Sequence, residues 1–166
     1  MIPKKIHYCW FGHNPLPKEY LKYMDSWHKF CPDYEIIEWN EDNFNIFEND
    51  YCREAYEAKK WAFVSDYARL KIIYEYGGIY LDTDVEVLKS LDPLILNNIG
   101  FLGFQNTEQV NTGLGFAASA KNVSAQEDYQ DKRVKNICKG YGEIIGKDKD
   151  EKNLEGKYDK KKCYNN

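Results

Sequence analysis

The stretch that decides the fold and the chemistry is Gly77-Gly78-Ile79-Tyr80-Leu81-Asp82-Thr83-Asp84. Its apolar run, residues 79–81, is typical of a short buried strand, and two carboxylates follow it closely. If the strand continues, Asp82 and Asp84 point to the same side, with their Cα atoms about 6.6 Å apart. Carboxylates this close repel each other unless a cation lies between them, which favours Mg²⁺ or Mn²⁺ with oxygen ligands. Two aspartates at this spacing also occur in solvated turns, so the tripeptide alone leaves both interpretations open.

The composition indicates a single globular domain. The chain has 166 residues, of which 43% are hydrophobic and 16% aromatic, and this is enough to bury a core. A net charge of −4 argues against nucleic-acid binding, because that function needs a basic surface. No apolar run approaches the roughly 18 residues of a membrane span. The five cysteines are scattered and suggest neither a zinc site nor a disulfide framework, so we expect a cytoplasmic protein with reduced thiols.

Charge divides the chain into two parts. Residues 1–120 carry 11 Lys and Arg against 18 Asp and Glu, whereas residues 121–166 carry 12 against 9. We therefore predict a folded core over 1–120 and a charged C-terminal part over 121–166. The basic balance of the second part predicts no more than a weak attraction to an anionic membrane surface, which would place the protein at the inner membrane face.

Strands alternate with helices along residues 1–120. The predicted strands cover residues 5–10, 34–39, 79–81, 99–104 and the end of 111–118. The strand over 79–81 is predicted to continue in extended form over 85–88. The predicted helices begin after Pro17 and at about Lys59, with a short helical turn at Asp92, a short helix within 40–50, and a polar helix over about 122–139. This order predicts an α/β fold with a largely parallel or mixed central sheet flanked by helices. Ligands of such sheets bind beyond the carboxyl ends of the strands.

The helix over residues 59–76 comes directly before the acidic stretch, and Gly77-Gly78 ends it. Its predicted apolar stripe is formed by Phe63, Tyr67, Leu70 and Tyr74, with Ile73 beside it. Asp66 and Arg69 are three residues apart and share one face. One interpretation is an exposed ion pair of little consequence. The other is a carboxylate for sugar hydroxyls beside a guanidinium for a diphosphate or sugar hydroxyl.

The first predicted strand ends in an aromatic residue. Trp10 is either a core residue or a platform on which a nucleobase stacks. His7, inside the strand, is predicted to be a packed or hydrogen-bonded core histidine. No histidine has a partner spacing that predicts a metal site.

Four blocks of sequence together resemble a known family: residues 2–12, 32–40, 62–84 and 111–116. The third contains Ala62-Phe63-Val64-Ser65-Asp66-Tyr67-Ala68-Arg69 and ends in the Asp82-Thr83-Asp84 motif. These blocks resemble the glycosyltransferases with a D-x-D motif in a sugar-binding region (glycosyltransferase family 32). Capsular polysaccharide enzymes, fungal initiating mannosyltransferases and the glucosylating domains of clostridial toxins belong to this group. The resemblance covers about residues 1–120.

The resemblance implies a GT-A fold and a metal-dependent, retaining transfer of a sugar from a UDP- or GDP-sugar to a glycan acceptor. A role in capsular or other surface polysaccharide synthesis is implied too. Carried onto this sequence, Asp84 would bind Mn²⁺ or Mg²⁺ directly, and Asp82 would contact the ribose or the metal through water. Asp66 and Arg69 would hold the donor sugar, and Trp10 the base. The motifs identify no protein nucleophile.

Residues 121–166 depart from the family pattern, in which this region helps to build the acceptor side. The acceptor region is therefore expected to be incomplete, and two further functions stay open. One is a non-catalytic module that binds a nucleotide-sugar. The other is a Mg²⁺-dependent phosphoryl-transfer enzyme or nuclease, which also uses paired carboxylates.

Overall fold

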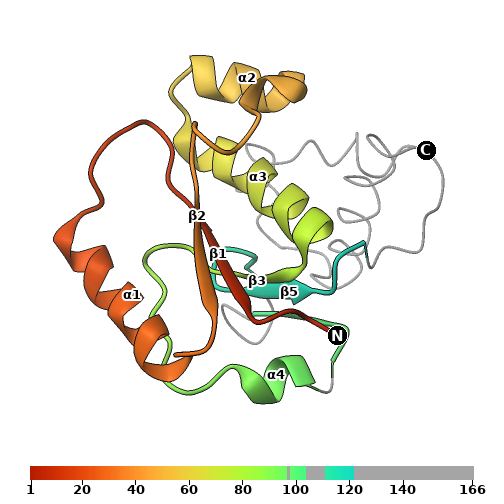
Figure 1. Cartoon of the computed structure of the whole chain (residues 1–166). Coiled ribbons are helices and arrows are strands. Elements are labelled where there is room, and N and C mark those ends of the chain that lie inside the picture. Colours follow the sequence, from red (N-terminus) through yellow and green to blue (C-terminus); the bar gives the residue numbers. More distant parts are fainter. Residues whose placement is uncertain (97, 104–110, 122–166) are drawn as a thin grey trace, which may run out of the picture.

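The computed structural model describes residues 1–96, 98–103 and 111–121 and forms a layered α/β structure (Figure 1). In chain order the elements are β1 (Lys5–Cys9), α1 (Lys18–Phe30), β2 (Glu35–Trp39), the 3₁₀ helix η1 (Ile46–Glu48), α2 (Asp50–Glu57), α3 (Trp61–Tyr76), β3 (Gly78–Tyr80), α4 (Asp92–Leu96), β4 (Gly100–Leu102) and β5 (Phe116–Ala118). None of the helices in these ranges has the length and apolar character needed to cross a membrane.

The central sheet is mixed, as the sequence predicts. Its strand order is β2-β1-β3-β5-β4. β1 pairs in parallel with β2 and β3, whereas β5 pairs antiparallel with β3 and β4. The carboxyl ends of the three parallel strands therefore meet at one edge of the sheet, where residues following Cys9, Trp39 and Tyr80 lie close together.

The sheet separates two apolar cores, and alternate side chains of β1 and β3 enter each one. Ile6 and Ile79 belong to the core that contains Trp27 of α1 and Ile95 of α4. Tyr80 belongs to the other core, with Cys9 of β1 and side chains of α2 and α3. Figure 1 shows α1 and α3 on opposite sides of the sheet.

α3 is buried on several sides rather than along one stripe, which corrects the sequence prediction. Val64, Ala68 and Ile72 are fully buried, and so are Asp66 and Arg69, at 2% and 5% exposure. Phe63 and Tyr67 are only partly buried. The reason is that the helix lies between the sheet and α2 and also forms a wall of the cavity described below, so that polar residues are covered as well.

The acidic motif lies in a turn and not on a continuing strand. β3 ends at Tyr80, and the Val85 N–H donates to the Asp82 carbonyl oxygen at 3.1 Å, closing a turn over Thr83 and Asp84. The prediction that alternation places both aspartates on one side of a strand is therefore wrong, and residues 85–88 form no strand. The sequence also gave no sign of α2. The helix predicted over residues 122–139 lies outside the described residues.

His7 joins three parts of the structure, and its prediction as a hydrogen-bonded core histidine is confirmed. The side chain is fully buried on β1. Its Nδ1 accepts from Trp39 Nε1 of β2 at 3.0 Å, so its Nε2 carries the proton and donates to the Gly77 carbonyl oxygen at 2.9 Å. Burial lowers the pKa of His7 to about 4 from its usual 6.5. The imidazole is thus neutral at pH 7 and fixes the start of the acidic stretch to the sheet.

We predict that the protein loses stability as the pH falls from 6.5 to 4, because the unfolded chain binds a proton at His7 before the folded chain does. The contribution of this residue is about 3 kcal/mol less at pH 4 than at pH 7. Urea unfolding at a series of pH values measures the effect. His7→Gln is the comparison variant, and its stability should fall less steeply over that interval. Parallel pH profiles of the two proteins would contradict the assignment.

Candidate functional site

A cavity of about 400 Å³ lies at the carboxyl ends of β1 and β3, and all five residues selected from the sequence line it. Trp10 comes from the end of β1, Asp66 and Arg69 come from α3, and Asp82 and Asp84 come from the turn after β3. The structure thus brings together residues separated by up to 74 positions in the chain. Their proximity is established, whereas their individual roles stay predictions.

Asp82 is held from both its side chain and its backbone. Its Oδ1 accepts from the Tyr80 hydroxyl at 2.9 Å and lies 3.5 Å from Arg69 Nη1. Its backbone N–H donates to the carbonyl oxygen of Gly113 at 2.8 Å. Burial raises the pKa of Tyr80 well above its usual value, so this phenol stays protonated and serves as a donor. Both side-chain contacts use Oδ1, whereas Oδ2 lies against the backbone of Gly113.

Asp66 and Arg69 form a buried ion pair, which excludes the exposed surface pair that the sequence left open. The Arg69 guanidinium also lies 5.7 Å from the centre of the Tyr80 ring. Arg69 therefore lies between two carboxylates, Asp66 on its own helix and Asp82 on the turn. A buried charge is retained only with such partners, so the three side chains form one electrostatic unit.

Asp84 is exposed at the mouth of the cavity. Within the described ranges, no group of three or more His, Cys, Asp or Glu side chains is arranged to hold a metal ion. Two carboxylates nevertheless suit Mg²⁺ or Mn²⁺, because such ions usually take one or two carboxylates and complete their shell with phosphate oxygens and water. Asp82 and Asp84 therefore fit a metal that binds together with a diphosphate.

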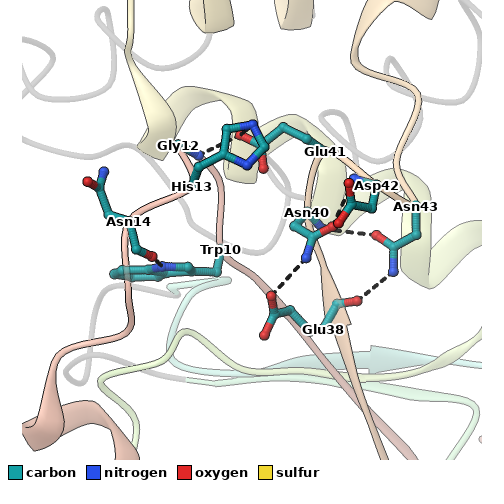
Figure 2. Close-up of polar contacts among 9 residues, drawn as sticks. All are labelled: Trp10, Gly12, His13, Asn14, Glu38, Asn40, Glu41, Asp42 and Asn43. Atoms are coloured by element: carbon teal, nitrogen blue, oxygen red, sulfur yellow. Dashed lines mark hydrogen bonds and ion pairs between the residues drawn. The ribbon is translucent and has the colours of Figure 1, made fainter.

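The loop after β1 fixes the orientation of Trp10 (Figure 2). The indole Nε1 donates to the Asn14 carbonyl oxygen at 2.6 Å, and the ring meets Tyr20 edge to face at a centroid distance of 5.9 Å. The same loop is tied to the segment after β2, since the Gly12 N–H donates to Glu41 Oε1 at 2.6 Å. Glu41 thus holds the loop that carries Trp10, and sequence reasoning did not identify it.

If Trp10 holds the base of a nucleotide, as the sequence resemblance implies, Glu41→Ala should weaken nucleotide binding about five- to tenfold by releasing the loop, which is about the net value of one hydrogen bond. Glu41→Gln keeps an acceptor oxygen for the Gly12 N–H and should restore most of the affinity. Calorimetric titration with UDP and GDP measures the difference. Equal losses in the two variants would assign Glu41 a role other than hydrogen-bond acceptor.

Several further cavity residues were not selected from the sequence. They are Tyr20, Trp61, Ser65, Thr83 and Asn111. Asn111 belongs to a block that the sequence resemblance includes, and its Oδ1 accepts from the Gly113 N–H at 2.8 Å. Trp61 lies against the loop after β1. A Cβ at Gly12 would be 2.7 Å from its indole ring, so only glycine fits where the loop crosses the ring.

Comparisons with known proteins show what this chain is similar to. Inositol phosphoceramide mannosyltransferase 3 of Schizosaccharomyces pombe is 36% identical over 102 residues, covering 57% of this chain and 27% of that protein. Initiation-specific alpha-1,6-mannosyltransferase of Candida albicans is 28% identical over 123 residues, covering 68% of this chain and 32% of that protein. The chain thus spans about a third or less of the length of these two relatives.

The solved structure of PaToxG glycosyltransferase has the same fold, with a TM-score of 0.56 at 17% identity, covering 73% of this chain and 55% of that one. This likeness confirms the GT-A-like fold expected from the sequence. A family model described as "glycosyltransferase sugar-binding region containing DXD motif" matches residues 17–100, about half of the chain, and includes four of the five selected cavity residues. The chain belongs to this family of DXD-motif glycosyltransferases.

Proposed function

We propose that this protein is a glycosyltransferase that moves a sugar from a nucleotide-sugar donor to a glycan acceptor with the help of Mn²⁺ or Mg²⁺. The charge of the cavity carries the proposal. Among the described residues its lining has three carboxylates, on Asp66, Asp82 and Asp84, and one guanidinium, on Arg69, which leaves a net charge of −2. Such a lining repels a bare diphosphate and attracts a divalent cation, so metal and donor would bind together.

Each side chain has a role that its position allows. Trp10 offers an aromatic face for the base. Asp66 and Arg69, fixed against each other, present rigid polar groups to sugar hydroxyls. Asp82 and Asp84 would hold the metal, which when bound supplies positive charge to the departing nucleoside diphosphate.

Two finer points belong to the proposal through family resemblance. They are transfer with retention of anomeric configuration and a role in capsular or other surface polysaccharide synthesis. A cytoplasmic location, proposed from the scattered cysteines, and a weak attachment to the inner membrane face, proposed from the charge of residues 121–166, complete it. The relatives are named for mannosyl transfer, so donors of mannose belong in any substrate survey.

Release of UDP or GDP from a panel of nucleotide-sugars, measured with Mn²⁺ and again with excess EDTA, tests the activity. Water serves as a minimal acceptor, and simple glycosides and oligosaccharides are added in turn. We expect one class of donor to be turned over only when metal is present. Metal-independent turnover would contradict the role of the metal, and absence of both binding and turnover with every donor would overturn the proposal.

The departure of residues 121–166 from the family pattern leaves a second candidate open, a module that binds a nucleotide-sugar without transferring it. Calorimetry separates the two functions. The module would bind a donor in the presence of Mn²⁺ and release no nucleotide with any acceptor.

A further inference from the structure

A second cavity, of about 490 Å³, lies beside the first and shares no lining residue with it. The segment after β2, residues 41–47, lines it together with Tyr56 of α2. Its volume falls within the roughly 300–1,000 Å³ of small-molecule sites. For a glycosyltransferase that handles both a donor and a glycan, a second pocket of this size raises the question of its ligand.

One wall separates the two cavities. Trp61 lines the first cavity, Tyr56 lines the second, and their rings pack edge to face at a centroid distance of 5.1 Å. Glu41 lines the second cavity while binding the Gly12 N–H of the loop that carries Trp10. A ligand in the second cavity would therefore lie next to a donor stacked on Trp10.

The lining selects a neutral ligand. It contains two carboxylates, Glu41 and Asp42, and no Lys or Arg among the described residues, so phosphates and other anions are repelled. The Glu41 side chain is only 10% exposed and is bound to the loop after β1, which leaves Asp42 as the one carboxylate open to the cavity. A single open carboxylate gives little attraction for a polycation.

Amides and aromatic rings make up the rest of the exposed lining. Asn43 and Asn45 are exposed, as is Phe47, at 65%. The Phe47 ring packs edge to face on Tyr56 at a centroid distance of 6.3 Å, and this contact favours its position beside the cavity. Amide and carboxylate groups bind hydroxyls, while aromatic faces cover the C–H face of a sugar ring, and together they suit a polyhydroxylated ring.

The segment is also rigid before any ligand binds. The Asn40 N–H donates to Asn43 Oδ1 at 2.9 Å, and Asn43 Nδ2 donates to the Glu38 carbonyl oxygen at 2.7 Å (Figure 2). Asn45 Oδ1 accepts from the Phe47 N–H at 3.2 Å. A lining with fixed polar groups loses little conformational entropy on binding.

From these observations we propose that the cavity lined by residues 41–47 and Tyr56 binds a neutral saccharide, as a subsite for a glycan chain. The choice of a glycan rests on the proposed function, whereas the existence of the subsite does not require that transfer occurs. Asp42, Asn43 and Asn45 would contact hydroxyls, and Phe47 would cover the apolar face of one ring.

Ligand-observed saturation-transfer NMR of the whole chain with neutral disaccharides and trisaccharides of mannose, glucose and galactose tests the proposal. We expect at least one saccharide to bind, and Phe47→Ala to weaken it about fivefold. Phe47→Trp, which keeps an aromatic face, should retain binding. Leu88→Ala is the matched control, because Leu88 is exposed at 72% and lines neither cavity, and it should change nothing.

Three outcomes would overturn the subsite. They are binding of none of the saccharides, equal binding by Phe47→Ala and the unaltered protein, and preference for an oligolysine peptide over every saccharide. Saccharide binding that disappears in Asp82→Asn would place the ligand in the first cavity instead. Nucleotide-sugar binding is measured separately with Mn²⁺, so failure of the donor site and failure of the subsite remain distinguishable.

Discussion

Asp84→Asn should lower metal-dependent turnover about a thousandfold, equivalent to about 4 kcal/mol of lost transition-state stabilisation. The expectation follows from charge: the amide keeps the shape of the side chain but removes half of the negative charge that Asp82 and Asp84 offer to the cation. Because Asp84 is exposed in a turn, the free energy of unfolding should change by less than about 0.5 kcal/mol. Asp82→Asn should cause a loss of similar size.

Glu86→Gln is the matched control for this experiment. Glu86 is an exposed carboxylate two residues further along, and it does not line the cavity. Nucleotide release with saturating Mn²⁺ gives the rates, and denaturant unfolding gives the stabilities. Turnover in Asp84→Asn that matches Glu86→Gln would remove the metal site from the D-x-D turn.

Arg69→Met should destabilise the protein by about 3–5 kcal/mol, because it leaves the Asp66 carboxylate buried without its cationic partner. Removing the charge of both partners, in Asp66→Leu with Arg69→Met, should recover much of the stability, since no ionised group is then left buried. Both variants should lose donor binding, because Arg69 also lies beside Asp82.

Arg53→Met tests whether burial of the ion pair is the reason for the large destabilisation expected of Arg69→Met. Arg53 pairs with Asp50 and Glu57 on the surface of α2, and its loss should cost less than about 1 kcal/mol. Urea unfolding of the four proteins gives the comparison. A double variant as unstable as Arg69→Met would show that the loss comes from packing of the guanidinium and not from an unpaired carboxylate.

The sequence was sufficient to predict the structure where the local pattern and the strand order act together. The apolar strands β1, β2 and β3 carry their own signals, and parallel strands must place their carboxyl ends at one edge. That rule predicted that Trp10 and Asp82 would lie near each other. Helix spacing placed Asp66 and Arg69 on one face, and the structure puts that face in the cavity.

The sequence was insufficient to predict the structure where contacts between residues far apart in the chain decide the local conformation or the burial of a side chain. Asp82 is followed by a turn because the chain pairs with Gly113 through the Asp82 N–H, and no pattern within residues 77–84 shows that partner. Burial of Arg69 depends on Asp66 and on the cover from neighbouring segments, whereas an i,i+3 pair alone predicts exposure. Glu41 went unnoticed because its only signal is a hydrogen bond to the loop after β1.

The contact between Asp82 and Gly113 has a consequence for the order of folding. A Cβ at Gly113 would overlap the Asp82 carboxylate, so the two segments approach as closely as glycine permits. This contact closes a loop of about 30 residues, which is shorter than the stretch between the paired Ile6 and Ile79, so its entropic cost is no greater than that of the parallel pairing. During synthesis, the D-x-D turn emerges well before the segment that shapes it. The D-x-D turn can therefore reach its working geometry only once residue 113 has been added to the chain and has packed against Asp82.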